Sequence, residues 1–231
     1  MRRLRDKRGG VRLRASAKDI FLGCEFLPVA CLERLRLAYR IVVDPLGAFR
    51  SLKDKGFKDS LCHMLTLGWV TALFSGALSV CGVDYTNPSN AGGSAQLFAP
   101  WALKVLGLEV GGLAEALFFA GFVMAGYLIL AAVSVPVLAS AAWLVTGRPA
   151  FGDLPRLSSV AVVYGMTPGF LFGWVPNPFY AVGLWATLWQ ALAVREVFGL
   201  SWWRTVVAVL LWITVVGVIH DLAGFLLGLI I

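Results

Sequence analysis

The sequence predicts an all-α membrane protein: a helical bundle of five transmembrane spans preceded by a cytoplasmic amphipathic helix. Three observations predict this class. Hydrophobic residues make up 59% of the 231 residues and charged residues only 14%, against about 25% charged residues in ordinary soluble domains. Mean hydropathy is +0.80. Basic residues are unevenly spread, because fifteen of the twenty Lys and Arg lie before residue 60.

Five apolar runs are long enough to cross a bilayer, which takes about 20 residues. They occupy residues 60–81, 112–146, 157–175, 178–194 and 205–231, which together form a membrane domain over residues 60–231. Before it, we expect a disordered basic tail over residues 1–18 and a cytoplasmic or interfacial helical segment over residues 19–59.

The second run is unusually long, and as one helix it would extend about 50 Å. We expect it either to tilt and protrude or to kink at Pro136. The alternative is a hairpin with its turn at Ser134–Val137, which would move four arginines to the outer side.

The basic residues also set the orientation. With a single second span, nineteen of the twenty Lys and Arg lie in the cytoplasm and only Lys104 lies outside, whereas the hairpin places five outside. Cytoplasmic loops carry the excess of Lys and Arg, so the single span is favoured. The sequence therefore predicts a multi-pass cell-membrane protein with a cytoplasmic N-terminus, an external C-terminus and one long outer loop over Gly82–Gly111.

The net charge of +7 could suggest nucleic acid as a partner. The basic residues, however, precede or flank apolar runs, so we expect no nucleic acid. Anionic lipids of the inner leaflet attract such segments and are the expected partners of this bilayer-embedded chain.

A short segment before the first span predicts a helix that lies on the inner leaflet. Asp44 is placed to cap this helix and Pro45 suits its first position. Phe49 belongs to an apolar stripe, and Arg50 stands beside it. Such an amphipathic pattern is typical of interfacial helices.

Small residues recur at four-residue spacing in four of the spans, for example at Gly68, Ala72 and Gly76 and again at Gly165 and Gly169. This spacing keeps them on one helix face, where they let backbones approach closely. We expect close packing within the bundle, although the same pattern would also serve a homo-oligomer.

Ionisable residues within a membrane are costly and are candidates for function. His220 and Asp221 lie in the last span, and Glu115 near the outer start of the second lies at a similar depth. They could form a proton relay or cation site; alternatively, they hold helices together or reach outer water. We expect His63 to be interfacial and Gln190 to form an interhelical hydrogen bond.

The third span contains Thr167-Pro168, where proline removes a backbone donor and frees a carbonyl. Such a break is a binding site in some transporters and a simple kink in other proteins. The sequence contains no HExxH, GxSxG or phosphate-loop motif. We therefore expect no enzymatic activity, no cofactor and no metal.

Four segments follow one another in a recognisable order: Val43–Lys53, Thr146–Asp153, Val163–Pro168 and Arg195–Ser201. Together they resemble the Yip1 family of small polytopic membrane proteins. This resemblance implies a helical bundle with a cytoplasmic N-terminus, a family Tyr and Pro at Tyr164 and Pro168, and no established catalytic activity.

Eukaryotic members of that family act in vesicle trafficking through prenylated small GTPases. Here the N-terminal region is short and basic, and the Arg-, Ala- and Gly-rich composition suits a prokaryotic member. The GTPase partner is therefore not carried over. The favoured function is a non-enzymatic scaffold or membrane-organising factor, with a protein partner or homo-oligomer possible. The alternatives are a small transporter or channel using Glu115, His220 and Asp221, or an accessory subunit of a membrane complex.

Overall fold

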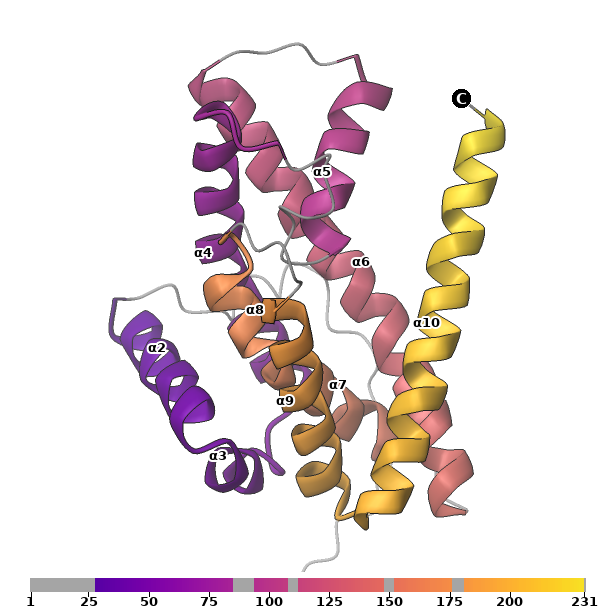
Figure 1. The fold of residues 1–231 in the computed structure, drawn as a ribbon. Helices are drawn as coiled ribbons and strands as arrows, with labels where there is room; N and C mark the ends of the chain where they lie inside the picture. The colour runs from indigo at the N-terminus through magenta and orange to yellow at the C-terminus, as the bar shows by residue number, and fades with distance from the viewer. Residues whose placement is uncertain (1–27, 85–93, 108–111, 148–151, 176–180, 231) are drawn as a thin grey trace, which may run out of the picture.

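The computed structural model describes residues 28–84, 94–107, 112–147, 152–175 and 181–230. Every regular element in these ranges is an α-helix (Figure 1), as the sequence predicts. In chain order the helices are α2 (Pro28–Val43), α3 (Pro45–Ser51), α4 (Phe57–Val80), α5 (Ser94–Val105), α6 (Leu113–Thr146), α7 (Leu154–Gly165), α8 (Thr167–Phe172), α9 (Ala181–Phe198) and α10 (Trp202–Ile230). The basic tail predicted for residues 1–18 lies outside the described residues.

Three helices, α4, α6 and α10, are long and apolar enough to cross a membrane. They contain 24, 34 and 29 residues. At about 1.5 Å per residue, each is longer than a hydrocarbon core of about 30 Å. They coincide with the first, second and fifth predicted spans. The third and fourth predicted spans coincide with α7–α8 and with α9, so the count of five crossings stays a prediction.

The long second run folds as one helix. α6 continues through Pro136 to Thr146, so the alternative hairpin with a turn at Ser134–Val137 is wrong. The helix ends at Gly147, whose backbone is left-handed with φ 62° and whose N–H donates to the Trp143 carbonyl. In Figure 1, α6 crosses the molecule obliquely, and it contacts α4, α5, α7 and α10.

The segment predicted as one outer loop, Gly82–Gly111, contains a helix. α5 packs against α6 and buries Ala99 and Ala102. α5 contains Pro100, a residue that disfavours the interior of a helix. Tertiary packing against α6 stabilises a helix that local propensity does not reveal.

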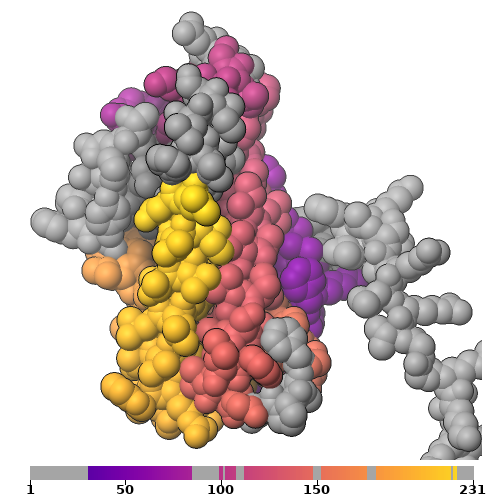
Figure 2. All heavy atoms as spheres, turned by 90° about the vertical axis from the view of Figure 1, so that its right-hand side faces the viewer, coloured from indigo at the N-terminus to yellow at the C-terminus, as the bar shows by residue number. Residues whose placement is uncertain are grey.

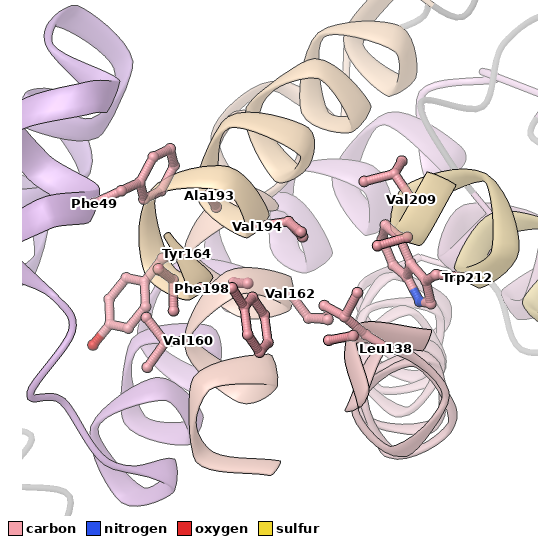
Figure 3. Packing of buried hydrophobic residues seen from close by; sticks show 14 of the residues in the cluster. Phe49, Leu138, Val160, Val162, Tyr164, Ala193, Val194, Phe198, Val209 and Trp212 are labelled. Atoms are coloured by element: carbon pink, nitrogen blue, oxygen red, sulfur yellow. The ribbon is translucent and has the colours of Figure 1, made fainter. Parts of the chain in front are cut away.

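Buried apolar side chains form two clusters, and α6 contributes to both. One cluster joins residues of α2, α3, α6, α7, α9 and α10, and Figure 3 shows Phe49, Tyr164, Leu138 and Trp212 among its members. The other joins residues of α2, α4, α5, α6, α7 and α8. α6 is central to the bundle, because it contributes to both clusters and contacts α4, α5, α7 and α10.

Only the first part of α10 is packed into the bundle. Trp212 is buried, whereas each described side chain beyond Val216 is exposed. Figure 2 shows α10, in yellow, lying against α6, in pink, and Figure 1 shows the end of α10 standing apart from the other helices. The apolar character of this free half fits an environment of lipid.

Two of the predicted small-residue positions lie where helix backbones meet. A Cβ at Gly76 of α4 would collide with the backbone carbonyl of Ala116 on α6. A Cβ at Gly165 of α7 would lie 2.7 Å from the Cα of Gln190 on α9. At these two contacts, glycine permits an approach that a methyl group would prevent.

We predict that Gly76→Ala destabilises the bundle by about 1–3 kcal/mol, because the added methyl overpacks a contact made by rigid backbone. Gly121→Ala is the matched control, since a Cβ there meets open space on the same pair of helices. That control should be neutral or stabilising, because alanine favours helix by about 1 kcal/mol over glycine. Thermal unfolding in one detergent measures both; equal shifts in the two variants would contradict the close approach.

Candidate functional site

The third predicted span is broken at Met166, between α7 and α8, and we call this point the helix break. Pro168 has no N–H, so the carbonyl of Tyr164 loses the donor that a continuous helix would supply. The hydroxyl of Thr167 replaces that donor, with its Oγ1 2.7 Å from the Tyr164 oxygen. The break that the sequence predicts at Thr167-Pro168 is therefore present and repaired locally.

A histidine from α4 completes the helix break. His63 is only 1% exposed, so its side chain faces neighbouring helices. Its predicted depth at the inner boundary of the first span stays a prediction. Its Nε2 lies 3.1 Å from Thr167 Oγ1, and its ring centroid lies 4.4 Å from that of Tyr164. The ring is buried because it packs, tilted by 38°, against Tyr164 and lies beside Thr167.

The hydrogen bonds also assign the role of His63 Nε2. Thr167 has one hydroxyl proton and donates it to the Tyr164 carbonyl, so its oxygen accepts from His63 Nε2–H. His63 Nδ1 has no hydrogen-bond partner among the described residues. The ring therefore positions Thr167 through one nitrogen only.

Hydroxyl groups on α4 and α6 also bind the backbone of α8. Thr71 Oγ1 lies 2.6 Å from the Phe170 carbonyl and 3.2 Å from that of Gly169. The hydroxyl of Tyr127 approaches the same Gly169 carbonyl at 3.5 Å. Helices α4 and α6 therefore both bond to carbonyls near the C-terminal end of α8, just beyond the helix break.

At the other end of α7–α9, the helices α2 and α3 form an arm, residues 28–52, that docks on the bundle. Asp44 caps α3 by accepting from the Gly47 N–H at 3.1 Å, and Pro45 occupies the first turn, as predicted. Phe49 is fully buried against the bundle (Figure 3). It is therefore unavailable to a leaflet, because α9 covers the apolar face of α3 that the sequence assigned to lipid.

An ion cluster joins the arm to α9. Arg50 Nε lies 2.8 Å from Glu196 Oε2, and Arg195 Nη1 lies 3.1 Å from Glu196 Oε1. Arg195 also stacks on Trp202 at 4.4 Å from the ring centroid. The hydrogen bond and the negative charge of Glu196 raise the pKa of Arg50 above its usual value. Glu196 is buried yet paired twice, which is the condition under which a buried carboxylate is tolerated.

Two further bonds hold the arm from its backbone side. Trp189 Nε1 donates to the Ile41 carbonyl at 2.8 Å, which is one of the carbonyls that the end of α2 leaves without a helical donor. Arg156 Nη1 donates to the carbonyls of Lys53 and Lys55. Sequence reasoning missed these contacts, because it used the arginines only to set orientation.

Two residues hold these contacts that the sequence did not predict to do so: Glu196 in the ion cluster and His63 at the helix break. Glu196 carried a signal, since it is the only acidic residue between residues 154 and 220 and follows Arg195 directly. The burial of His63 carried none, because helical periodicity alone does not say which face of α4 meets α8.

The predicted cluster of Glu115, His220 and Asp221 stays a prediction, because the side chain of His220 lies outside the described residues. Glu115 lies half-buried in the first turn of α6, and Asp221 is exposed on the second half of α10. In the part of the chain that is described, no group of three His, Cys, Asp or Glu could hold a metal ion.

We predict that Thr167→Val destabilises the protein by about 1–3 kcal/mol, because it leaves the Tyr164 carbonyl and His63 Nε2 buried without partners. Thr187→Val is the matched control, since the Thr187 hydroxyl bonds only to the Gly183 carbonyl of its own helix. Thermal unfolding in detergent should separate the two variants, and a loss at Thr187 as large as that at Thr167 would refute this account of the helix break.

Phe49→Ala should release the arm from α9, because the truncation of a buried Phe costs about 3–5 kcal/mol. Limited proteolysis in detergent micelles should then cut between residues 28 and 56 several-fold faster than in the unaltered chain. Leu46→Ala, on the more exposed side of α3, serves as the control and should leave the cleavage rate unchanged. An unchanged rate for Phe49→Ala would show that the arm is held elsewhere.

Comparison of the chain with protein-family models, curated proteins and solved structures found no match. The resemblance to the Yip1 family therefore rests on the four segments of the sequence described above.

Proposed function

We propose that this chain is a Yip1-like, non-enzymatic integral membrane protein that acts as a scaffold or membrane-organising factor. The observation that carries the proposal is the docked arm. Phe49 and the Arg50–Glu196 ion pair hold α2 and α3 against the end of the bundle. A rigid arm at a membrane surface can present its exposed side chains to a partner or to lipid in a fixed orientation, because the embedded helices hold it in place.

The segments that resemble the Yip1 family coincide with the points at which the helices are held together. Asp44 and Pro45 begin α3, Tyr164 and Pro168 form the helix break, and the Arg195–Ser201 segment joins α9 to α10 beside the ion cluster. A shared pattern at joints favours a shared architecture. The positions of these segments in the fold support the family proposal in addition to their amino-acid sequences.

Five crossings with a cytoplasmic N-terminus and an external C-terminus complete the proposal. α7 and α8 together extend about 28 Å and α9 about 27 Å, which is close to the thickness of a hydrocarbon core of about 30 Å. A re-entrant hairpin of α7–α9 is the competing arrangement. Both arrangements place every other loop on the same side and differ only in residues 173–180.

A topology map therefore tests the crossing count. We predict that a cysteine at Asn177 reacts with a membrane-impermeant maleimide added from outside, that one at Gly152 reacts only after permeabilisation, and that one after Ile231 reacts from outside. No external reaction at Asn177 would favour the re-entrant hairpin. External reaction at Gly152 would overturn the orientation itself.

The scaffold role is tested by reconstitution into vesicles, with vesicle shape measured by electron cryo-microscopy. Arg50→Glu should undock the arm, because two carboxylates then face each other at residues 50 and 196, and it should abolish any change of vesicle shape caused by the unaltered chain. Lys58→Glu is the matched control, since it makes the same charge change at an exposed site. Deletion of residues 1–55 should act like Arg50→Glu.

The same vesicles distinguish the competing function. Ion or proton flux that is unaffected by Arg50→Glu, together with no effect of the chain on vesicle shape, would replace the scaffold proposal with a transporter.

A further inference from the structure

Three environments meet along α2. One side of the helix packs on the bundle: Ile41 is fully buried, Ala38 is 1% exposed, and α4 and α8 are among the helices that α2 contacts. A second side exposes large apolar side chains, with Tyr39 69% and Val43 62% exposed. A third side carries the exposed charged residues Glu33, Arg36 and Arg40. A surface helix of a soluble protein has only two sides, an apolar one that faces the core and a polar one that faces water.

The exposed apolar side chains form a continuous stripe, which we call the α2 stripe: Leu32, Leu35, Tyr39 and Val43. Their spacing of three, four and four residues keeps them on one helix face. Arg36 and Arg40 follow the stripe on its outer flank, at about 100° per residue. The opposite flank of the stripe runs into the face buried against the bundle.

We propose that α2 lies in the inner leaflet, with the α2 stripe against acyl chains and with Arg36 and Arg40 at anionic headgroups. The proposal rests on the membrane placement of the arm in the proposed function, and it does not need the scaffold role. In this proposal the lipid-binding helix of the arm is α2 and not α3, because the apolar face of α3 packs against α9.

Position and charge both favour lipid over a protein as the occupant of the α2 stripe. α2 packs on α4, which is long and apolar enough to cross a membrane, and on α8. An apolar stripe flanked by arginines is complementary to an anionic leaflet, whose surface attracts basic residues.

Photo-crosslinking of the full chain in nanodiscs tests this placement. Benzoylphenylalanine is incorporated at Leu35 or Tyr39 in the α2 stripe, or at Glu33 on the charged side as a control. The nanodiscs contain phosphatidylcholine with a minority of phosphatidylglycerol. Intact-protein mass spectrometry after irradiation shows whether one lipid has been added and which lipid it is.

We expect lipid adducts at Leu35 and Tyr39 to exceed those at Glu33 several-fold. Phosphatidylglycerol should be over-represented among the adducts relative to its share of the nanodisc. Arg36→Gln with Arg40→Gln should return that share to the bulk value. Lys53→Gln with Lys58→Gln removes the same charge from exposed positions away from α2 and should leave the enrichment intact.

Three outcomes would overturn the proposal, and a fourth would reject the scaffold function alone. Adducts at Tyr39 no more frequent than at Glu33 would place the stripe in water, and peptide adducts in place of lipid would mean that protein covers it. Lipid adducts without enrichment of phosphatidylglycerol would refute the role of the arginines. Lipid adducts combined with no effect of Arg50→Glu on vesicle shape would reject the scaffold function alone.

Discussion

A proline inside an apolar segment removes one backbone donor, and this bundle is arranged around the replacement of that donor at Pro168. Where no water is available, each freed carbonyl needs a partner from the protein itself. Thr167 supplies one within the same segment, and Thr71 brings α4 onto the backbone of α8. His63 then fixes Thr167 from α4. Satisfying the helix break therefore determines how α4, α7 and α8 lie against one another, and α2 packs on the surface that they form.

The ion cluster solves a second problem of the same kind, at the end of the bundle where the arm docks. A buried Glu196 alone would be costly, but two arginines from different helices compensate its charge. Arg50 comes from α3 and Arg195 from α9, so the Arg50–Glu196 pair can form only when the arm is docked. The charge that the sequence places near the membrane thus has two roles: some arginines hold the arm, and those on α2 remain exposed beside an apolar stripe.

Several elements could be predicted because their signals are local. The cap at Asp44 and Pro45 depends on residues within one turn, and the continuity of α6 follows from an uninterrupted apolar run in which Pro136 alone does not form a turn. The break at Thr167-Pro168 could likewise be predicted, because proline has no backbone N–H to donate. By contrast, α5 was expected to be loop, and the burial of His63 was not predicted. Both outcomes depend on what packs against them, namely α6 for α5, and α7 with α8 for His63.

By itself, the sequence determined the helical class, the apolar runs, the caps and the break, because composition, periodicity and the chemistry of proline act over a few residues. Tertiary structure alone decided which residues meet. It paired Glu196 with Arg50 across 146 positions of the chain and turned Phe49 inward. The physical reason is that an apolar helix face has the same pattern whether it meets lipid or protein, so only the packing of the neighbouring helices distinguishes the two.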